Sequence, residues 1–142
     1  MPSGGSPAWI DVKPDAATKT ELIGVLERFC SAFECRDAEA VMRLFGPDPE
    51  LMVVTSEESV LRGPAQLKRF LGRYIDGPTI YSWEWRRYDV SIAGPVAWLL
   101  AEGTETAKGK DGLERHPYRM TMVLERRDAR WLLMQVHGSS PH

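Results

Sequence analysis

Residues 119 to 141 have the sequence RMTMVLERRDARWLLMQVHGSSP. Two runs rich in apolar residues flank the polar stretch Arg127-Asp128-Ala129-Arg130. Apolar runs on both sides of a short polar segment are typical of a β-hairpin. This part of the chain therefore predicts two long antiparallel strands, 113–125 and 131–139, joined by a tight turn.

The same pattern extends towards the N-terminus. Residues 80–92 and 96–106 are rich in aromatic and β-branched side chains, which favour strands. Gly94-Pro95 separates these two runs, and the polar loop 108–112 contains two glycines. We therefore expect four consecutive long strands that form an antiparallel meander.

Before residue 80, apolar residues recur at three- and four-residue steps, which predicts helices. The expected helices cover residues 15–34, residues 37–45, and a third segment that begins at Gly63-Pro64 and ends at Gly77-Pro78. Short strands are expected at 51–55 and 60–62. Because the helices precede the long strands, the fold class is α+β, with the N-terminal helices packed on one curved, mainly antiparallel sheet. Residues 1–14 are predicted to be a flexible segment and 15–142 a single domain.

Composition excludes several classes of function. The net charge is −2 and the charges of both signs are interspersed, which argues against nucleic-acid binding and against a basic membrane anchor. No apolar run approaches the ~20 residues that cross a bilayer, and the N-terminus has no signal-peptide core. The protein is therefore predicted to be cytoplasmic.

The sequence predicts neither a metal site nor a cofactor. Cys30 and Cys35 are five residues apart in the first helix, so their side chains point to different faces and a disulfide is not expected. No further metal ligands accompany them, and the chain lacks phosphate-loop, nucleophile-elbow and zinc-protease motifs.

Four segments, in this order, resemble the SnoaL-like branch of the nuclear transport factor 2 superfamily. They are ERFCSAFECRDAEAVMRLF, LRGPAQLKRFL, AGPVAWLLAEG and RMTMVLERRDARWLLMQVHGSSP. The last segment is also similar to the association domain of calmodulin-dependent kinase II. The resemblance extends from Asp15 to Pro141 and implies a cystatin-like cone with a pocket, usually in a dimer.

The family includes steroid isomerases, polyketide cyclases, dehydratases, ligand sensors and assembly modules. Ketosteroid isomerases of this family use a tyrosine, an aspartate base and a protonated aspartate. The matching positions fall near Phe29, Val53 and Thr121, none of which carries the required group. The resemblance therefore argues against ketosteroid isomerase chemistry in this chain.

Strand alternation predicts which side chains face the helices. The more apolar sets are expected to face inward, so the cone should be filled by Met120, Met122, Leu124, Met134 and Val136, with Trp98, Glu102, His116 and Tyr118 at its open end. Leu99, Val123, Trp131 and Leu133 should face outward beside Arg119, Gln135 and His137. An outer face this apolar predicts a homodimer through the sheet, while a bulge would decide whether His116 or His137 faces the pocket.

The expected ligand-binding residues combine aromatic, apolar and ionisable side chains. They are Tyr74, Trp83, Trp98, Glu102, His116, Tyr118, Met120 and Met122. Glu102 and His116 are the candidates for an acid or base. Each position also has a structural interpretation, as core packing, a rim residue or an anchored strand end.

Three functions remain open from the sequence. The first is a homodimer that binds a small apolar or aromatic ligand. The second is an isomerase, cyclase or dehydratase acting on a polyketide- or steroid-like substrate. The third is a non-catalytic assembly module whose cavity is filled core.

Overall fold

The computed structural model describes residues 12–55 and 59–141. The predicted flexible segment therefore lies largely outside the described residues, as do part of the first short hairpin and the C-terminal His142. Val12 is described, and its carbonyl oxygen accepts a hydrogen bond from the Ile92 amide at 2.6 Å. The chain thus already contacts the sheet before its first helix begins.

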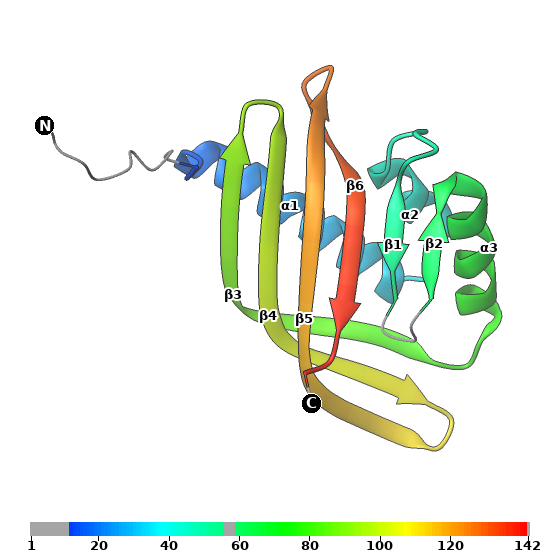
Figure 1. Cartoon of the computed structure of the whole chain (residues 1–142). Coiled ribbons are helices and arrows are strands. Elements are labelled where there is room, and N and C mark those ends of the chain that lie inside the picture. The colour runs from blue at the N-terminus through cyan, green and yellow to red at the C-terminus, as the bar shows by residue number, and fades with distance from the viewer. Residues whose placement is uncertain (1–11, 56–58, 142) are drawn as a thin grey trace, which may run out of the picture.

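Helix α1 spans Ala16–Glu34 and lies along the concave side of the sheet (Figure 1). The Asp15 side chain accepts a hydrogen bond from the Thr18 amide, as expected of an N-cap residue. The buried residues of α1 recur at helical spacing and form the predicted apolar stripe: Leu22, Val25, Leu26, Phe29, Cys30 and Ala32.

Helix α2, Ala38–Leu44, is capped by Asp37, whose side chain accepts from the Ala40 amide. The chain turns between the two helices at Arg36, which has a φ of 54°. The Arg36 guanidinium donates to the carbonyl oxygens of Ile75 and Thr79. This contact ties the end of α1 to the end of α3.

Strands β1, Met52–Val54, and β2, Val60–Arg62, form a short antiparallel pair. Helix α3 then spans Gly63–Asp76, with Pro64 in its first turn as predicted. Gly63 has a φ of 79°, a conformation that glycine adopts without steric cost.

The long strands are β3, Ile80–Ala93; β4, Val96–Gly109; β5, Gly112–Arg127; and β6, Arg130–Ser139. The six strands are ordered β2-β1-β6-β5-β4-β3. Neighbouring strands are antiparallel except β1 and β6, which are parallel. Asp128 and Ala129 form the predicted β5–β6 turn, and both have positive φ.

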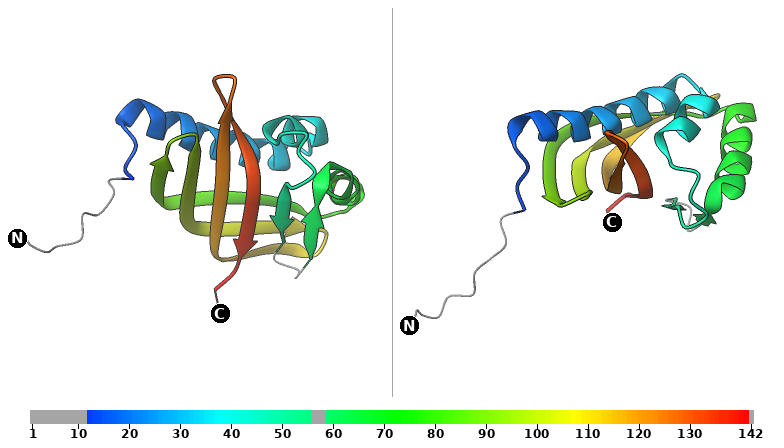
Figure 2. Two further views of the ribbon diagram at one scale, coloured as in Figure 1. Left: turned by 45° about the horizontal axis from the view of Figure 1, so that its top comes forward. Right: turned by 90° about the horizontal axis from the view of Figure 1, so that it is seen from above.

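The sheet is curved, and the helices occupy its concave side. Figure 1 shows β3, β4 and β5 bending along their length, and Figure 2 shows α1 running along the sheet while α2 and α3 close one end. The register of β3 against β4 shifts between Trp85 and Arg87, which is a bulge. Bulges bend the strand that carries them, so this one contributes to the curvature. The α+β prediction is confirmed.

Cross-strand register divides the concave face into rows of side chains. Two rows, here called the filled rows, are Ile92–Ala97–Leu124–Leu133 and Val90–Leu99–Met122–Val136. Three further rows, here called the hollow rows, are Tyr88–Ala101–Met120–Gly138, Trp85–Gly103–Tyr118 and Trp83–Glu105–His116. The filled rows carry aliphatic side chains, whereas the hollow rows carry glycines, aromatic rings and one acid.

Candidate functional site

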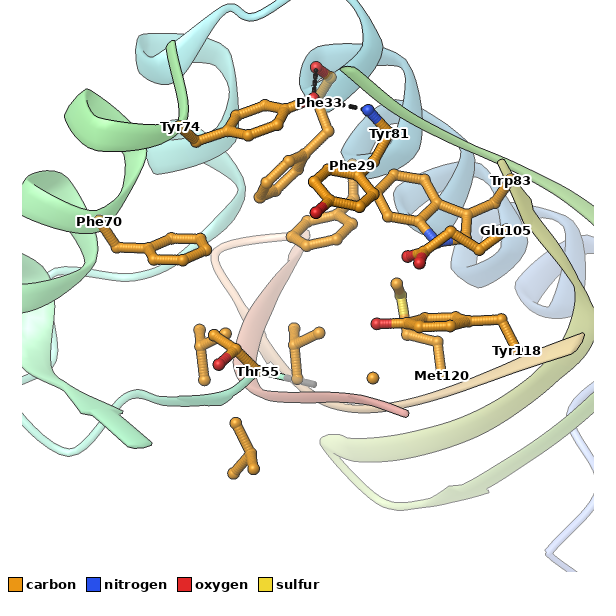
Figure 3. Close-up of a pocket in the computed structure, with 14 residues that line it drawn as sticks. Phe29, Phe33, Thr55, Phe70, Tyr74, Tyr81, Trp83, Glu105, Tyr118 and Met120 are labelled. Carbon is orange, nitrogen blue, oxygen red and sulfur yellow. Dashed lines mark hydrogen bonds between the residues drawn. The ribbon is translucent and has the colours of Figure 1, made fainter. Parts of the chain in front are cut away.

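A cavity of about 100 Å³ lies between the hollow rows, the second half of α1, and α3. Its walls come from elements far apart in the sequence, as Figure 3 shows. The lining residues are Phe29, Phe33, Val53, Val54, Thr55, Phe70, Tyr74, Tyr81, Trp83, Glu105, Tyr118, Met120, Val136 and Gly138. The lining is apolar and aromatic apart from Thr55, the tyrosine hydroxyls and the carboxylate of Glu105.

The aromatic side chains form a continuous wall. The ring of Phe33 lies 4.9 Å from that of Phe29, 5.2 Å from that of Tyr74 and 5.9 Å from that of Trp83, measured between centroids. Trp83 continues the wall to Tyr118 at 6.3 Å. These separations lie in the range of favourable offset and edge-to-face packing.

Glu105 is the buried acid at the centre of the site, with 4% of its surface exposed. It lies in one cross-strand row between Trp83 and His116. The indole nitrogen of Trp83 donates to Glu105 Oε2 at 2.9 Å, and His116 Nε2 lies 2.9 Å from Glu105 Oε1. Burial raises the pKa of Glu105 above its ordinary value, and the hydrogen bonds from His116 and Trp83 oppose that rise.

Two glycines allow close approaches of neighbouring atoms in the hollow rows. At Gly103 a methyl group would overlap the carbonyl oxygen of Glu84 beside the β3 bulge. At Gly138 it would overlap the hydroxyl end of Tyr118, whose ring lies across this glycine. Tyr118 can therefore lie flat over β6 because the residue beneath it has no side chain.

Four of the predicted ligand-binding residues line the cavity: Tyr74, Trp83, Tyr118 and Met120. The Tyr74 hydroxyl donates to the Phe33 carbonyl oxygen and accepts from the Tyr81 amide, so it anchors α3 to α1 and β3. Met122 is buried in the filled rows and does not line the cavity. His116 lies behind Glu105, with 35% of its side chain exposed, and reaches the cavity through that carboxylate.

The predicted positions of Trp98 and Glu102 at the open end of the cone are wrong. Trp98 is 40% exposed on the outer face, and Glu102 borders a separate surface groove with Arg86, Arg87 and Arg119. In β4 the small residues Ala97, Ala101 and Gly103 face inward. Small residues fit there because α1 and the neighbouring aromatic rings fill the space on the concave side of the strand. Leu99, predicted to face outward, shares this inner face and is buried.

The prediction of which β6 residues face inward and which face outward is also wrong for the first part of the strand. The register against β5 shifts between Val123 and Leu124, so Met134 is the extra residue of a bulge and is only half-buried. Trp131 and Leu133, expected on the outer face, are buried as a result. Beyond the bulge Val136 faces inward and His137 outward, which leaves His116 as the histidine on the cavity side.

Glu105 was not among the predicted residues, and it is the acid that the cavity contains. The positions matched to ketosteroid isomerase do not supply another: Phe29 and Val53 line the cavity, whereas Thr121 is exposed on the outer face. Glu105, the acid of this cavity, therefore lies at none of the three positions that match the catalytic residues of ketosteroid isomerase.

The other reactive side chains lie apart from the cavity lining. Cys30 and Cys35 are both free thiols. Burial raises the pKa of Cys30 to about 12, so its thiol stays protonated at neutral pH. Among residues 12–55 and 59–141, no cluster of three or more His, Cys, Asp or Glu side chains could hold a metal ion. No helix in this part of the chain is long and apolar enough to cross a membrane.

Comparison with solved structures supports the architecture. A candidate dehydratase of the NTF2-like (nuclear transport factor 2-like) family from Streptomyces avermitilis matches with a TM-score of 0.82 at 18% identity, over 91% of this chain and 99% of that one. An NTF2-like superfamily protein from Salmonella enterica matches with a TM-score of 0.79 at 18% identity, over 91% and 94%. The association domain of Caenorhabditis elegans CaMKII matches with a TM-score of 0.69 at 20% identity, over 87% and 96%. At these identities the likeness shows the fold.

No curated protein matches this sequence. A protein of unknown function with a cystatin-like fold from Nostoc punctiforme also matches, with a TM-score of 0.70 at 13% identity over 93% of this chain and 96% of that one, in agreement with the predicted cone. The family model described as the SnoaL-like domain matches residues 23–142, which is most of the chain. This protein therefore belongs to the SnoaL-like domain family.

Proposed function

We propose that this protein binds a small apolar or aromatic ligand in the cavity of its cone. The observation that carries the proposal is a cavity walled by packed aromatic rings that ends at one buried carboxylate, Glu105. Ligand sites in proteins commonly combine a mainly apolar lining with a few polar groups that orient the ligand.

The volume of the cavity limits the size of this ligand. An apolar cavity of about 150 Å³ in another protein binds benzene. The cavity here is about 100 Å³ and open on one side, so it supports a ligand with one ring or a short branched chain. A rigid polycyclic substrate would require wall side chains such as Phe70 or Tyr81 to move.

A panel of single-ring and polycyclic compounds, screened by thermal denaturation, tests the proposal. A ligand that binds the folded state raises the melting temperature. Thr55→Phe should block the cavity, since Thr55 lines it, and should abolish the shift. Thr106→Phe is the matched control, because Thr106 lies on the outer face of β4. A panel without hits would favour an assembly module instead.

We also propose that the protein is a homodimer through the outer face of the sheet. Trp98 is 40% exposed there, beside Val123 on β5 and next to the Leu100–Thr121 pair. The structural likeness to CaMKII association domains supports self-association. Light scattering should find a dimer that Trp98→Glu converts to a monomer and that Thr20→Glu, at an exposed position of α1 on the other side of the sheet, leaves intact. A monomeric wild-type protein would contradict the proposal.

The hydrogen bond between Glu105 and His116 favours a second candidate function, acid–base catalysis. Glu105 faces the cavity, while His116 binds its other side and is partly exposed, so a proton could pass between ligand and water through this pair. A panel hit with a C–H group next to a carbonyl should then exchange that hydrogen in D2O. The exchange, followed by mass spectrometry, should be lost in Glu105→Gln. A bound ligand without exchange would leave binding as the function.

A further inference from the structure

We propose that the ligand of this cavity carries an organic ammonium group, which binds against the carboxylate of Glu105 beside the rings of Trp83 and Tyr118. The inference rests on the proposed function, since it assumes that the cavity binds a ligand. It adds the charge of that ligand, which follows from the charges and rings of the lining.

The charged groups of the lining favour a cation. Glu105 is the one ionisable acid among the residues that line the cavity, and none of those described is a lysine or arginine. An anionic ligand would place its charge near the carboxylate without a compensating partner. A cation would instead compensate a carboxylate that burial has removed from most of its water.

The carboxylate retains the capacity to accept such a partner. An ionised carboxyl group has about four lone-pair sites. Trp83 occupies one on Oε2 and His116 one on Oε1. Positions on both oxygens therefore remain for a ligand, and the two existing hydrogen bonds hold the carboxylate in place. Burial raises the pKa of Glu105, the hydrogen bonds from His116 and Trp83 oppose that rise, and a cationic ligand would oppose it further.

The rings beside the carboxylate supply a second attraction for a cation. Trp83 and Tyr118 have centroids 6.3 Å apart with planes at 45°, and Figure 3 shows the Glu105 carboxylate between them. The negative face of an aromatic ring attracts an ammonium group, most strongly when the site excludes water. Phe29 and Phe33 continue the same wall, so the apolar body of the ligand has a place beside its charged group.

Two matched pairs of probes separate charge from shape. Choline and 3,3-dimethylbutan-1-ol have nearly the same shape but differ in charge, and benzylammonium and benzyl alcohol test a primary amine in the same way. Calorimetric titration of the wild-type protein should show the cation of at least one pair binding about tenfold or more tighter than its neutral partner. Glu105→Gln should reduce that preference to about twofold while the neutral compound binds as before.

Each outcome bears on the inference. Equal binding of cation and neutral partner in both pairs would overturn it while leaving the proposed function supported. A preference that persists in Glu105→Gln would show that the carboxylate is not the partner and would also overturn it. If neither these probes nor the single-ring panel bind, the proposed function itself fails. The wild-type comparison needs no variant, and Glu102→Gln, which removes a carboxylate of β4 that does not line the cavity, should retain the cation preference.

Discussion

The filled rows and the hollow rows lie on the same face of the same strands, yet the filled rows form core and the hollow rows border the cavity. The filled rows contain Leu99, Met122, Leu124 and Leu133, and all are almost fully buried. The hollow rows place Gly103 and Gly138 among aromatic rings. Leucine and methionine side chains fill the concave face in the filled rows, whereas each glycine lets the backbone of Glu84 or the ring of Tyr118 approach its strand closely.

The difference indicates how this cone separates stability from binding. Burial of aliphatic side chains in the filled rows supplies the main stabilising term. In the hollow rows, burial raises the pKa of Glu105. Burying its ionised form costs free energy, and this part of the sheet therefore contributes less to the stability of the fold. Variants that are matched across the two sets of rows can test this division.

The largest difference is expected between Leu124→Ala and Met120→Ala. Both residues lie on the inner face of β5, and both are buried. Leu124→Ala should lower the free energy of unfolding by about 4 kcal/mol, since its neighbours enclose the space that it leaves. Met120→Ala should cost about 2 kcal/mol, because Met120 already borders the open cavity. If urea denaturation showed equal losses of unfolding free energy for the two variants, the division between filled and hollow rows would be contradicted.

Gly103→Ala should have the next largest effect. The added methyl group overlaps the backbone of Glu84, and backbone atoms cannot move aside as the end of a side chain can. We expect a loss of about 3 kcal/mol in urea denaturation. Gly72→Ala in α3 is the control, since it has open space and lies in a helix, where alanine should stabilise by about 1 kcal/mol. A Gly103→Ala variant as stable as the wild type would show that β3 adapts there.

Gly138→Ala should affect binding more than stability. Its methyl group meets the hydroxyl end of Tyr118, and that side chain can rotate away. The ring then moves out of its place in the cavity wall. The free energy of unfolding should fall by about 1 kcal/mol, and the ligand-induced shift in melting temperature should disappear. A retained shift would mean that Tyr118 does not define the binding site.

Much of the fold could be predicted from the sequence because its signals are local. Asp15 and Asp37 cap helices, Gly63-Pro64 begins α3, and the turn at Asp128-Ala129 lies where polar residues separate two apolar runs. Which side chains of each strand face the helices was less predictable. Assigning the larger residues inward reversed β4, where the inner residues are small because helix and rings fill the cone.

The candidate site could be predicted in part. Trp83, Tyr118 and Met120 were identified because aromatic and methionine side chains are common in ligand pockets. Glu105 was missed because the inner face of β4 was placed one residue out of phase. The signal was present in the hairpin: with Lys110-Asp111 as the turn, pairing back from Gly109 and Gly112 places Glu105 opposite His116. The bulge at Met134 has no comparable local signal in the sequence.

The smallest expected effects concern pH, and they should have opposite signs at the two ends of the concave face. Burial raises the folded-state pKa of Glu105 above its ordinary 4.5, so the folded state holds the proton more strongly than the unfolded chain does. Its contribution to stability is greatest below pH 4.5 and is lost as the pH rises through the folded-state pKa. The stability of the wild type relative to Glu105→Gln should therefore fall with rising pH above 4.5.

Asp15, which caps α1 beside the filled rows, should behave in the opposite way. The amide of Thr18 lowers the pKa of this carboxyl below its ordinary 3.8. Its contribution is fully present above pH 3.8 and is lost as the pH falls through the folded-state pKa. Urea denaturation between pH 3 and 7 should show the advantage of the wild type over Asp15→Asn shrinking towards low pH. Slopes of the same sign in the two comparisons would contradict the assignment of Glu105 as a buried acid that costs the fold stability.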